Sequence, residues 1–308
     1  MSTDFNTAIV KQQIIDFMTG FTIETTPGSA AKTPDYREHL RPGTEIAVTF
    51  LPGSDFADTV ATSKRLKEEG FVPLPHFAAR SIRTQGEFED YLNTLQGEVG
   101  IEHAVALGGA VDKPLGDFES SMQLLETGLF DKYGIKSIGV AGHPEGSPDI
   151  NASGLREALS WKNSFKERTD SYVYIATQFC FEAEPIIAWD KLIQSEGNKL
   201  PIHLGVPGLA TIKTLLNHAK ACGIGSSMRV LTRQAKNITK LLTVKAPDKL
   251  VMDLARYHAE NPNCGIKKVH MYPLGGMKKS AAWSYAVTDG DFTVDPKGKG
   301  FKVNREIG

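Results

Sequence analysis

Eight short runs of β-branched and small apolar residues recur along the chain, and each is followed by a longer amphipathic stretch. Nearly continuous apolar runs are typical of strands that are buried on both faces, as strands of parallel sheets are. The amphipathic stretches supply the crossover helices that join parallel strands. The sequence therefore predicts a parallel α/β protein, with strands at 21–25, 46–50, 71–76, 103–107, 137–142, 172–179, 201–206 and 268–274.

The segments between these strands carry helix signals. The clearest is "FADTVATSKRLKEEG", where Asp55 is a predicted N-cap, apolar residues follow a 3.6-residue period and Gly70 is the stop. The other predicted helices are 34–40, 84–97, 117–132, 151–168, 183–195, 208–222 and much of 226–260.

Eight strand–helix units favour a closed barrel over an open sheet. A (β/α)8 TIM barrel needs about 250 residues, whereas doubly wound sheets usually have about five or six strands. An open sheet stays an alternative, because periodicity does not report closure. We expect a single barrel domain at 1–290, with an N-terminal helix, and a short C-terminal extension at 291–308.

Composition excludes several function classes. The chain has 35 basic and 36 acidic residues, so no strong field attracts nucleic acid or an anionic membrane. The N-terminus has no secretory signal, and no apolar run approaches the roughly 20 residues of a spanning helix. Cys180, Cys222 and Cys264 are far apart, which argues against structural zinc or a disulfide framework and favours the cytoplasm. Nucleotide-binding glycine motifs and the usual hydrolase and zinc-protease motifs are missing from the sequence.

Polar residues end the predicted strands. In a TIM barrel the reaction site lies at the carboxyl ends of the strands, so these residues predict one ring of ligand-facing groups. The fourth strand leads into "LGGAVD" and the fifth into "GHPEGSPD". The other strand-end residues are Glu24, Thr49, His76, Gln178 and Tyr272.

Each of these residues also has a structural explanation. Thr49 can bond local backbone, His76 can be a satisfied core histidine, and Glu24 can form a salt bridge. A carboxyl group among aliphatic neighbours is desolvated, however, which favours its protonated form and makes Glu24 a candidate general acid. The buried amide expected at Gln178 needs hydrogen-bonding partners, and Cys180 is expected to be core.

The motifs as a set resemble the 5,10-methylenetetrahydrofolate reductases, over roughly residues 20–287. The most specific part is "GVAGHPEGSP" followed about 30 residues later by "TQFCF", which is similar to the family's G-V-A-x-x-P-E-x-H-P and T-Q-x-x-F motifs. The weaker matches, in family order, are "IETTPG", "AVTF", "PLPHFAAR", "AVALGGA", "VPGL" and "VHMYPL".

The resemblance implies a TIM barrel that binds FAD and uses NADH or NADPH to reduce methylenetetrahydrofolate to methyltetrahydrofolate. The folate ring must open before it accepts hydride, and opening needs a proton, which the resemblance assigns to Glu24. Gln178 corresponds to the glutamine that contacts pterin and nicotinamide in turn, and Phe181 and Tyr272 fall at substrate positions. The implied flavin-binding residues are Thr49, His76, Leu107, Gly108, Gly109, Ala110, His143, Asn163 and Lys166.

The sequence departs from the family at flavin positions. The usual L-R-G-D loop reads "LGGA", so Gly108 replaces Arg and Ala110 replaces Asp, while His143 replaces a Tyr. Two alternatives follow: FAD with altered contacts, or a flavin-independent reductase that takes hydride directly from NADH. Reversed direction, a non-enzymatic folate- or flavin-binding barrel, and a barrel enzyme of another class, such as a lyase or aldolase, are further alternatives. We also expect a homo-oligomer.

Overall fold

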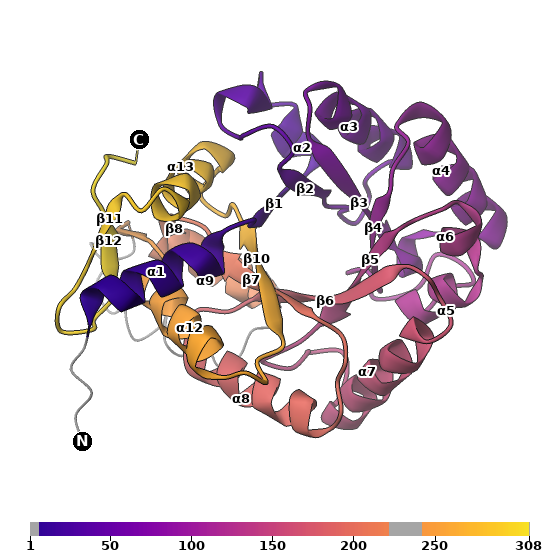
Figure 1. The fold of residues 1–308 in the computed structure, drawn as a ribbon. Helices are drawn as coiled ribbons and strands as arrows, with labels where there is room; N and C mark the ends of the chain where they lie inside the picture. Colours follow the sequence, from indigo (N-terminus) through magenta and orange to yellow (C-terminus); the bar gives the residue numbers. More distant parts are fainter. Residues whose placement is uncertain (1–5, 222–241, 308) are drawn as a thin grey trace. The chain divides into compact units, whose positions relative to one another are not determined.

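The computed structural model describes residues 6–221 and 242–307, and in it the main sheet is a closed barrel of parallel strands (Figure 1). The order of neighbouring strands is β1-β10-β7-β6-β5-β4-β3-β2. All eight predicted strands are confirmed, and so is closure in place of an open sheet. The strands are β1 (Thr22–Thr25), β2 (Glu45–Val48), β3 (Val72–Ala78), β4 (His103–Leu107), β5 (Ser137–Gly142), β6 (Tyr172–Phe179), β7 (Ile202–Pro207) and β10 (Ile266–Tyr272).

Helices follow most strands, as the amphipathic segments predict. Asp55 caps α3 as expected, because its carboxylate accepts a bond of 2.9 Å from the Ala57 amide. The α-helices are α1 (Thr7–Met18), α2 (Pro27–Ala30), α3 (Phe56–Glu68), α4 (Gln85–Glu98), α5 (Ser121–Glu126), α6 (Leu129–Lys132), α7 (Ala152–Lys166), α8 (Ala183–Ser195), α9 (Ile212–Ala221), α12 (Asp248–Glu260) and α13 (Met277–Thr288).

Three predicted helices differ from the structure. The segment 34–40 holds only a 3-10 turn at Tyr36–Glu38, because Pro42 disfavours helical backbone at the residue before it and so ends the segment early. The segment 117–132 splits into α5 and α6 at Gly128, whose φ is +70°. The segment 208–222 begins instead with the short strand β8 (Ala210–Thr211), which pairs with β9 (Val244–Lys245). Cys222 and the first part of the predicted helix 226–260 lie outside the described residues.

The chain divides into two compact units. One consists of Thr22–Gly142 and Arg156–Ala176. In this unit Phe77 of β3 packs against helix side chains, with ring centroids 5.7 Å from Phe88 and 4.8 Å from Tyr91 of α4 and 5.2 Å from Phe130 of α6. Each such buried ring stabilises the fold by about 1.5–3 kcal/mol, so this cluster fixes the outer helices on the sheet.

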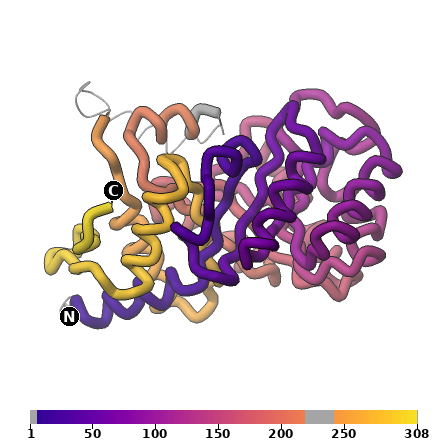
Figure 2. Tube along the Cα trace, turned by 90° about the horizontal axis from the view of Figure 1, so that it is seen from above, coloured from indigo at the N-terminus to yellow at the C-terminus, as the bar shows by residue number. Residues whose placement is uncertain are grey.

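The other unit consists of Met1–Phe21, His143–Leu155 and Thr177–Gly308. Here α1 contacts α12, α13 and the C-terminal hairpin of β11 (Phe292–Val294) and β12 (Phe301–Val303), which is yellow beside the indigo helix in Figure 2. Trp283 of α13 is fully buried and stacks on Phe301 at 5.8 Å. The sequence did not predict α13, because much of its buried face is small residues such as Ser280 and Ala281, which give a weak apolar signal.

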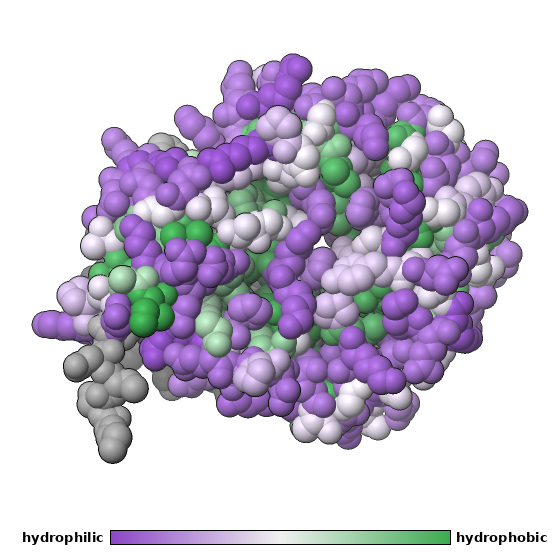
Figure 3. Space-filling model, viewed as in Figure 1, coloured by the Kyte–Doolittle hydropathy of each residue, from purple (hydrophilic) through white to green (hydrophobic). Residues whose placement is uncertain are grey.

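The surface carries mainly hydrophilic side chains on the face shown in Figure 3, with smaller hydrophobic areas between them. In the part of the chain that the structure describes, no helix is both long and apolar enough to span a bilayer. Cys180 and Cys264 are buried free cysteines, as predicted for Cys180.

A buried carboxylate joins three segments of the second unit. Asp190 of α8 is 0% exposed and accepts hydrogen bonds from the Tyr257 hydroxyl at 2.6 Å, Gln194 Nε2 at 3.1 Å and the Gly265 amide at 3.2 Å. We expect Asp190→Ala to lower the free energy of unfolding by about 2–4 kcal/mol, because it leaves buried donors unsatisfied. Urea denaturation measures this. Asp253→Ala on α12 is the control, because the partly exposed carboxylate of Asp253 only pairs with Lys249 at the surface, and this change is expected to cost about 0.5 kcal/mol or less. Equal effects of the two changes would contradict the network.

Asp248 predicts a pH-dependent stability. It begins α12 and accepts a bond of 2.9 Å from Trp283 Nε1, while burial raises the pKa of its carboxyl from 3.8 to about 6. Because the folded-state pKa is raised, protonation favours the fold, and this contribution is complete below pH 4 and lost as pH rises towards 6. The free energy of unfolding of Asp248→Asn, relative to that of wild type, should therefore be about 2 kcal/mol more favourable at pH 7 than at pH 4. Urea denaturation at both pH values measures the difference, and a pH-independent difference would refute the assignment.

Candidate functional site

The inner face of β2, β3 and β4 is marked by a small apolar cluster. Ala47, Leu74 and Val105 are buried together, one from each strand. Phe77 points the other way, towards the helices. Since side chains alternate along a strand, residues two positions after each cluster member lie on the same inner face.

Glu24, Thr49 and His76 share this inner face. Glu24 pairs with Ala47 in the register of β1 and β2, while Thr49 and His76 follow Ala47 and Leu74 by two residues. His76 is 9% exposed and lies two residues before the end of β3 at Ala78, so the prediction that the third strand ends at His76 was wrong. The inward position of His76 is a consequence of alternation and not of a strand end.

The Glu24 carboxyl and the Thr49 hydroxyl interact directly. Thr49 Oγ1 donates to Glu24 Oε2 at 3.2 Å, and the Thr49 amide donates to the Thr25 carbonyl at 2.8 Å. Both side chains are half-buried. The backbone bond holds the first residue beyond β2 in line with β1, so the hydroxyl is positioned to orient the carboxyl group.

The loop after β4 presents main chain instead of large side chains. Leu107 ends β4, and a Cβ added at Gly108 would meet nothing within 4 Å. Gly109 has a φ of +92°, which side-chain-bearing residues rarely adopt, and Ala110 is exposed. A flat ligand could therefore approach the backbone here.

Arg80 holds this loop in place. Its amide donates to the Gly108 carbonyl at 2.9 Å, and its guanidinium donates to the carbonyls of Val111 and Glu119 at 3.4 and 3.0 Å. The sequence did not predict this role, because no local pattern connects residue 80 with the loop at 108–119. The arginine thus positions the loop through main-chain oxygens.

Two predicted cofactor residues lie on α7. The Asn163 amide nitrogen donates to the Leu159 carbonyl of its own helix at 3.0 Å. The Lys166 ammonium donates to the Thr169 carbonyl at 3.3 Å, in the segment that leads into β6. These bonds tie both side chains to the helix or to the loop after it.

Lys162, one helical turn before Lys166, was missed by the sequence analysis. It is 7% exposed, and its ammonium donates to the Ala141 carbonyl of β5 at 2.8 Å. Burial lowers the pKa of Lys162 from 10.5 to about 8. The available signal was its spacing of three from the buried Phe165, which places both on the inner face of α7.

The ends of β6 and β10 bring two of the predicted substrate residues, Phe181 and Tyr272, against the same ring of Phe179. The Tyr272 hydroxyl donates to the Thr177 carbonyl at 2.8 Å, and the Phe179 ring lies 5.1 Å from Tyr272 and 5.5 Å from Phe181. Gln178 is half-buried, one residue before the end of β6. Its side-chain amide makes no hydrogen bond among the described residues, so it is available to a ligand.

The loop after β5 begins at His143, whose carbonyl accepts a bond of 3.1 Å from the Gly146 amide. Cys180 follows β6 and is 1% exposed. Burial raises the pKa of its thiol well above the ordinary value, and the nearby Glu145 carboxylate raises it further. The thiol therefore stays protonated, which agrees with a core cysteine and not with a nucleophile.

Three basic residues on β7 and β10 were also missed. Lys268 pairs with His203 in the strand register, and His270 follows on the same face of β10. Burial, together with the charges of Lys268 and His270, lowers the pKa of His203 to about 3. His203 is therefore neutral at physiological pH, and its alternation with apolar residues in "PIHLGV" was the signal for an inward side chain.

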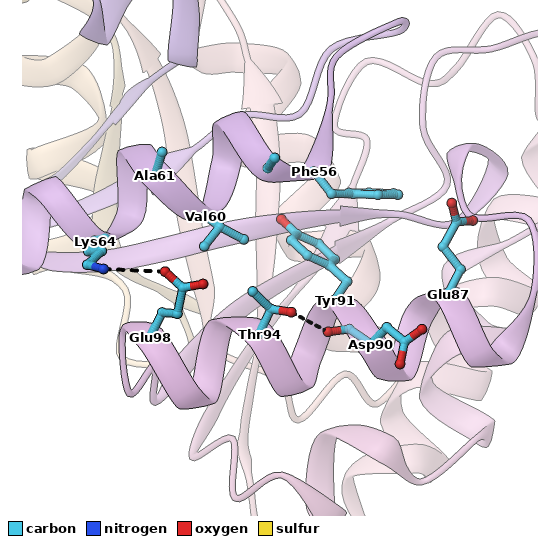
Figure 4. Close-up of a pocket in the computed structure, with 10 residues that line it drawn as sticks. Phe56, Val60, Ala61, Lys64, Glu87, Asp90, Tyr91, Thr94 and Glu98 are labelled. Carbon is cyan, nitrogen blue, oxygen red and sulfur yellow. Dashed lines mark hydrogen bonds and ion pairs between the residues drawn. The ribbon is translucent and has the colours of Figure 1, made fainter.

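Two cavities lie away from the strand ends. A groove of about 520 Å³ between α3 and α4 is lined by Phe56, Val60 and Tyr91, with the Lys64–Glu98 ion pair of 3.4 Å across it (Figure 4). A cavity of about 730 Å³ lies near the ends of α8 and α12 and before β10. Neither contains a predicted site residue, so the candidate site rests on the strand-end residues.

The fold and the candidate site together define the class of protein. The protein is a closed (β/α)8 barrel with carboxyl, hydroxyl, imidazole and amide groups at or near its strand ends, where barrel enzymes place their active sites. Residues 35–280, most of the chain, match the family "Methylenetetrahydrofolate reductase". The chain belongs to that family, which indicates an oxidoreductase with a folate substrate.

Solved structures that align with this chain are enzymes with low sequence identity to it. A family GH18 chitinase from Chromobacterium violaceum is 10% identical, covering 80% of this chain and 75% of its own, with a TM-score of 0.39. A protein named as a lyase/mutase from Burkholderia cenocepacia J2315 is 9% identical (92% and 86% covered, TM-score 0.43). D-psicose 3-epimerase, solved in the presence of D-fructose, is 11% identical (82% and 84% covered, TM-score 0.40). At these scores the likeness carries no argument about function.

Proposed function

We propose that the protein is a methylenetetrahydrofolate reductase that moves hydride from NADH or NADPH, by way of FAD, to 5,10-methylenetetrahydrofolate and so forms 5-methyltetrahydrofolate. Family membership supports the substrate class. The observation that carries the proposal is the half-buried Glu24 carboxyl on the inner face of β1, with the Thr49 hydroxyl bonded to it.

Glu24 is the proposed proton donor. The five-membered ring of the folate opens to an iminium ion only if its departing nitrogen receives a proton. A protonated carboxyl group donates one hydrogen bond and keeps acceptor capacity, so Glu24 can give its proton to the nitrogen while Thr49 Oγ1 holds the other oxygen. The iminium carbon then accepts hydride.

The residues after β4 fit a flat cofactor. Gly108 leaves the main chain accessible, which suits close approach of a planar ring. When bound, a flavin supplies a two-electron carrier between nicotinamide and folate. We propose that Thr49, His76, Leu107, Gly108, Gly109, Ala110, His143, Asn163 and Lys166 bind it.

Gln178, Phe181 and Tyr272 are the proposed substrate contacts. The Gln178 amide offers both donors and an acceptor, which suits the pterin and the carboxamide of nicotinamide equally. Phe181 and Tyr272 offer aromatic faces on which either ring can stack, and the Tyr272–Thr177 bond holds one of them in place. Two substrates that share these contacts must bind in turn, which gives ping-pong kinetics.

A second candidate is the flavin-independent route within the same family. The β4 loop supports it, because Gly108 and Ala110 offer a flavin no charged side chain. In this case nicotinamide and folate bind together, and hydride passes directly between them.

Anaerobic spectroscopy of the purified protein tests the proposal. The proposed function predicts a yellow protein whose absorption near about 450 nm is lost with NADH and restored by methylenetetrahydrofolate. Colourless protein that oxidises NADH only when the folate is present supports the second candidate. A protein that does neither contradicts both.

We predict that Glu24→Gln separates the two half-reactions. Folate reduction should fall about 100-fold or more, because the amide cannot donate the proton, whereas bleaching by NADH should change less than about twofold. Stopped-flow absorbance measures both steps. Glu45→Gln is the matched control, because it makes the same change at the first residue of β2. Equal losses in both half-reactions would contradict the proton-donor role.

We predict that Gln178→Ala slows both half-reactions, each by about tenfold, because one amide serves both substrates. The same stopped-flow steps measure it, with exposed Gln12→Ala on α1 as the control. An effect on only one half-reaction would refute shared contacts.

A further inference from the structure

A buried hydrogen bond fixes the last residue of β1. The hydroxyl groups of Tyr36 and Thr25 lie 2.6 Å apart, and the two residues are 0% and 4% exposed. Thr25 directly follows Glu24, so the two side chains leave the strand on opposite faces. Burial raises the pKa of Tyr36, so its phenol stays protonated. The bond therefore anchors the outer side of β1 next to the inward-facing carboxyl group.

The segment that carries Tyr36 is itself held in place by α3. The Arg65 guanidinium donates hydrogen bonds of 2.9, 2.6 and 2.9 Å to the carbonyls of Ala30, Thr33 and Pro34. Its central carbon lies 5.3 Å from the centre of the Tyr36 ring. These contacts keep the connection between β1 and Tyr36 in one arrangement.

Glu69, at the C-terminal end of α3, fixes the main chain of Tyr36. Its carboxylate accepts a bond of 2.9 Å from the Tyr36 amide and one of 2.7 Å from Arg65 Nε. The Phe71 ring packs edge-on against Tyr36, with the ring centroids 6.3 Å apart. The amide, the ring and the hydroxyl of Tyr36 are thus each held by a different neighbour.

From Thr25 the constraint passes to Glu24 through Thr49. The Thr25 carbonyl accepts the Thr49 amide at 2.8 Å, and Thr49 Oγ1 donates to Glu24 Oε2 at 3.2 Å. Tyr36, Thr25, Thr49 and Glu24 form one series of hydrogen-bonded residues, and all four belong to the same compact unit. A rotation of Thr25 would therefore move the carbonyl that positions Thr49, and with it the hydroxyl that holds the carboxyl group.

Stability does not explain why this pair is polar. Replacing both partners of a buried hydrogen bond by apolar groups of the same shape is often nearly neutral for the free energy of unfolding. Phe and Val would fill nearly the same space as Tyr36 and Thr25. An apolar pair lacks direction, however, because only a hydrogen bond constrains both distance and angle. The polar pair therefore favours a role in orientation.

We propose that Tyr36 is a positioning residue for the proton-transfer step, in which it holds Thr25 and, through Thr49, the Glu24 carboxyl group. The inference rests on the proposed function, in which Glu24 gives its proton to the departing folate nitrogen. A proton donor must lie within hydrogen-bonding distance of the atom that it protonates, and small misplacements of reacting groups cost large factors in rate. Hydride transfer from nicotinamide needs no proton from Glu24, so the effect of Tyr36 is confined to the folate step.

The test compares Tyr36→Phe, Thr25→Val and the double variant with wild type in the full chain. At saturating FAD, each variant should slow the folate half-reaction by about tenfold, and the double variant should be no slower than the single ones, because all three lose the same bond. Bleaching by NADH should change less than about twofold. In the flavin-independent case the same loss should appear in kcat and not in KM for NADH. Additive losses, or equal losses in both half-reactions, would contradict the proposal.

Thermal unfolding separates orientation from stability. The single variants leave one buried hydroxyl without this partner and should unfold at a lower temperature, whereas the double variant should unfold within about 2 °C of wild type. A double variant that regains the wild-type folate step together with its stability would make the pair structural and overturn the proposal.

Two further variants serve as controls. Thr25→Ser keeps the hydroxyl and should retain the folate step within about threefold of wild type. Tyr133→Phe is the matched control in the same unit, because it removes a phenol hydroxyl that bonds Glu89 at 3.2 Å. It should leave both half-reactions unchanged.

Hydrogen exchange keeps the test independent of the reaction. The Thr49 amide should exchange at least about tenfold faster in Tyr36→Phe and in the double variant than in wild type, while the amides of β4 should not change. If wild type reduces no folate, the reductase proposal fails, but the Thr49 amide still reports whether Tyr36 holds this part of the barrel. Unchanged exchange at Thr49, or an equal acceleration in β4, would overturn the positioning role.

Discussion

The two-residue alternation of side chains along the barrel strands is the constraint on which the proposed chemistry depends. On β3 it directs Phe77 to the aromatic residues of α4 and α6 and therefore His76 to the inner face. On β1 and β2 it aligns Glu24 with Ala47 and lets Thr49 reach the carboxyl group. The same packing that stabilises the outer helices thus orients the reactive groups.

Buried polar groups in this protein are of two kinds. Asp190 accepts hydrogen bonds from Gln194 of its own helix, from Tyr257 of α12 and from the Gly265 amide, so its burial is compensated and holds α8, α12 and the start of β10 together. Lys162 has a single carbonyl partner, so its burial is poorly compensated.

Much of the barrel follows from the sequence, because its strands are apolar runs and its longer helices have strong periodicity and caps, such as Asp55. The sequence does not show the contacts between residues that are far apart in the chain. No local pattern connects Arg80 to the loop at 108–119 or Lys162 to Ala141. Glu24 and Gln178 were predicted as site residues because the strand ends of a barrel carry its active site, whereas His203 and Lys268 were not singled out because they lie inside strands. Helix α13 was not predicted because its buried residues are mostly small and give a weak apolar periodicity.

The most direct test of the proposed reaction is the ratio of its two products, oxidised nicotinamide and 5-methyltetrahydrofolate. Under anaerobic conditions, the protein is incubated with NADH or NADPH and 5,10-methylenetetrahydrofolate, and the oxidised nicotinamide and 5-methyltetrahydrofolate are quantified by mass spectrometry. The account predicts equal amounts of the two products. Nicotinamide that stays reduced, with no 5-methyltetrahydrofolate formed, would contradict it.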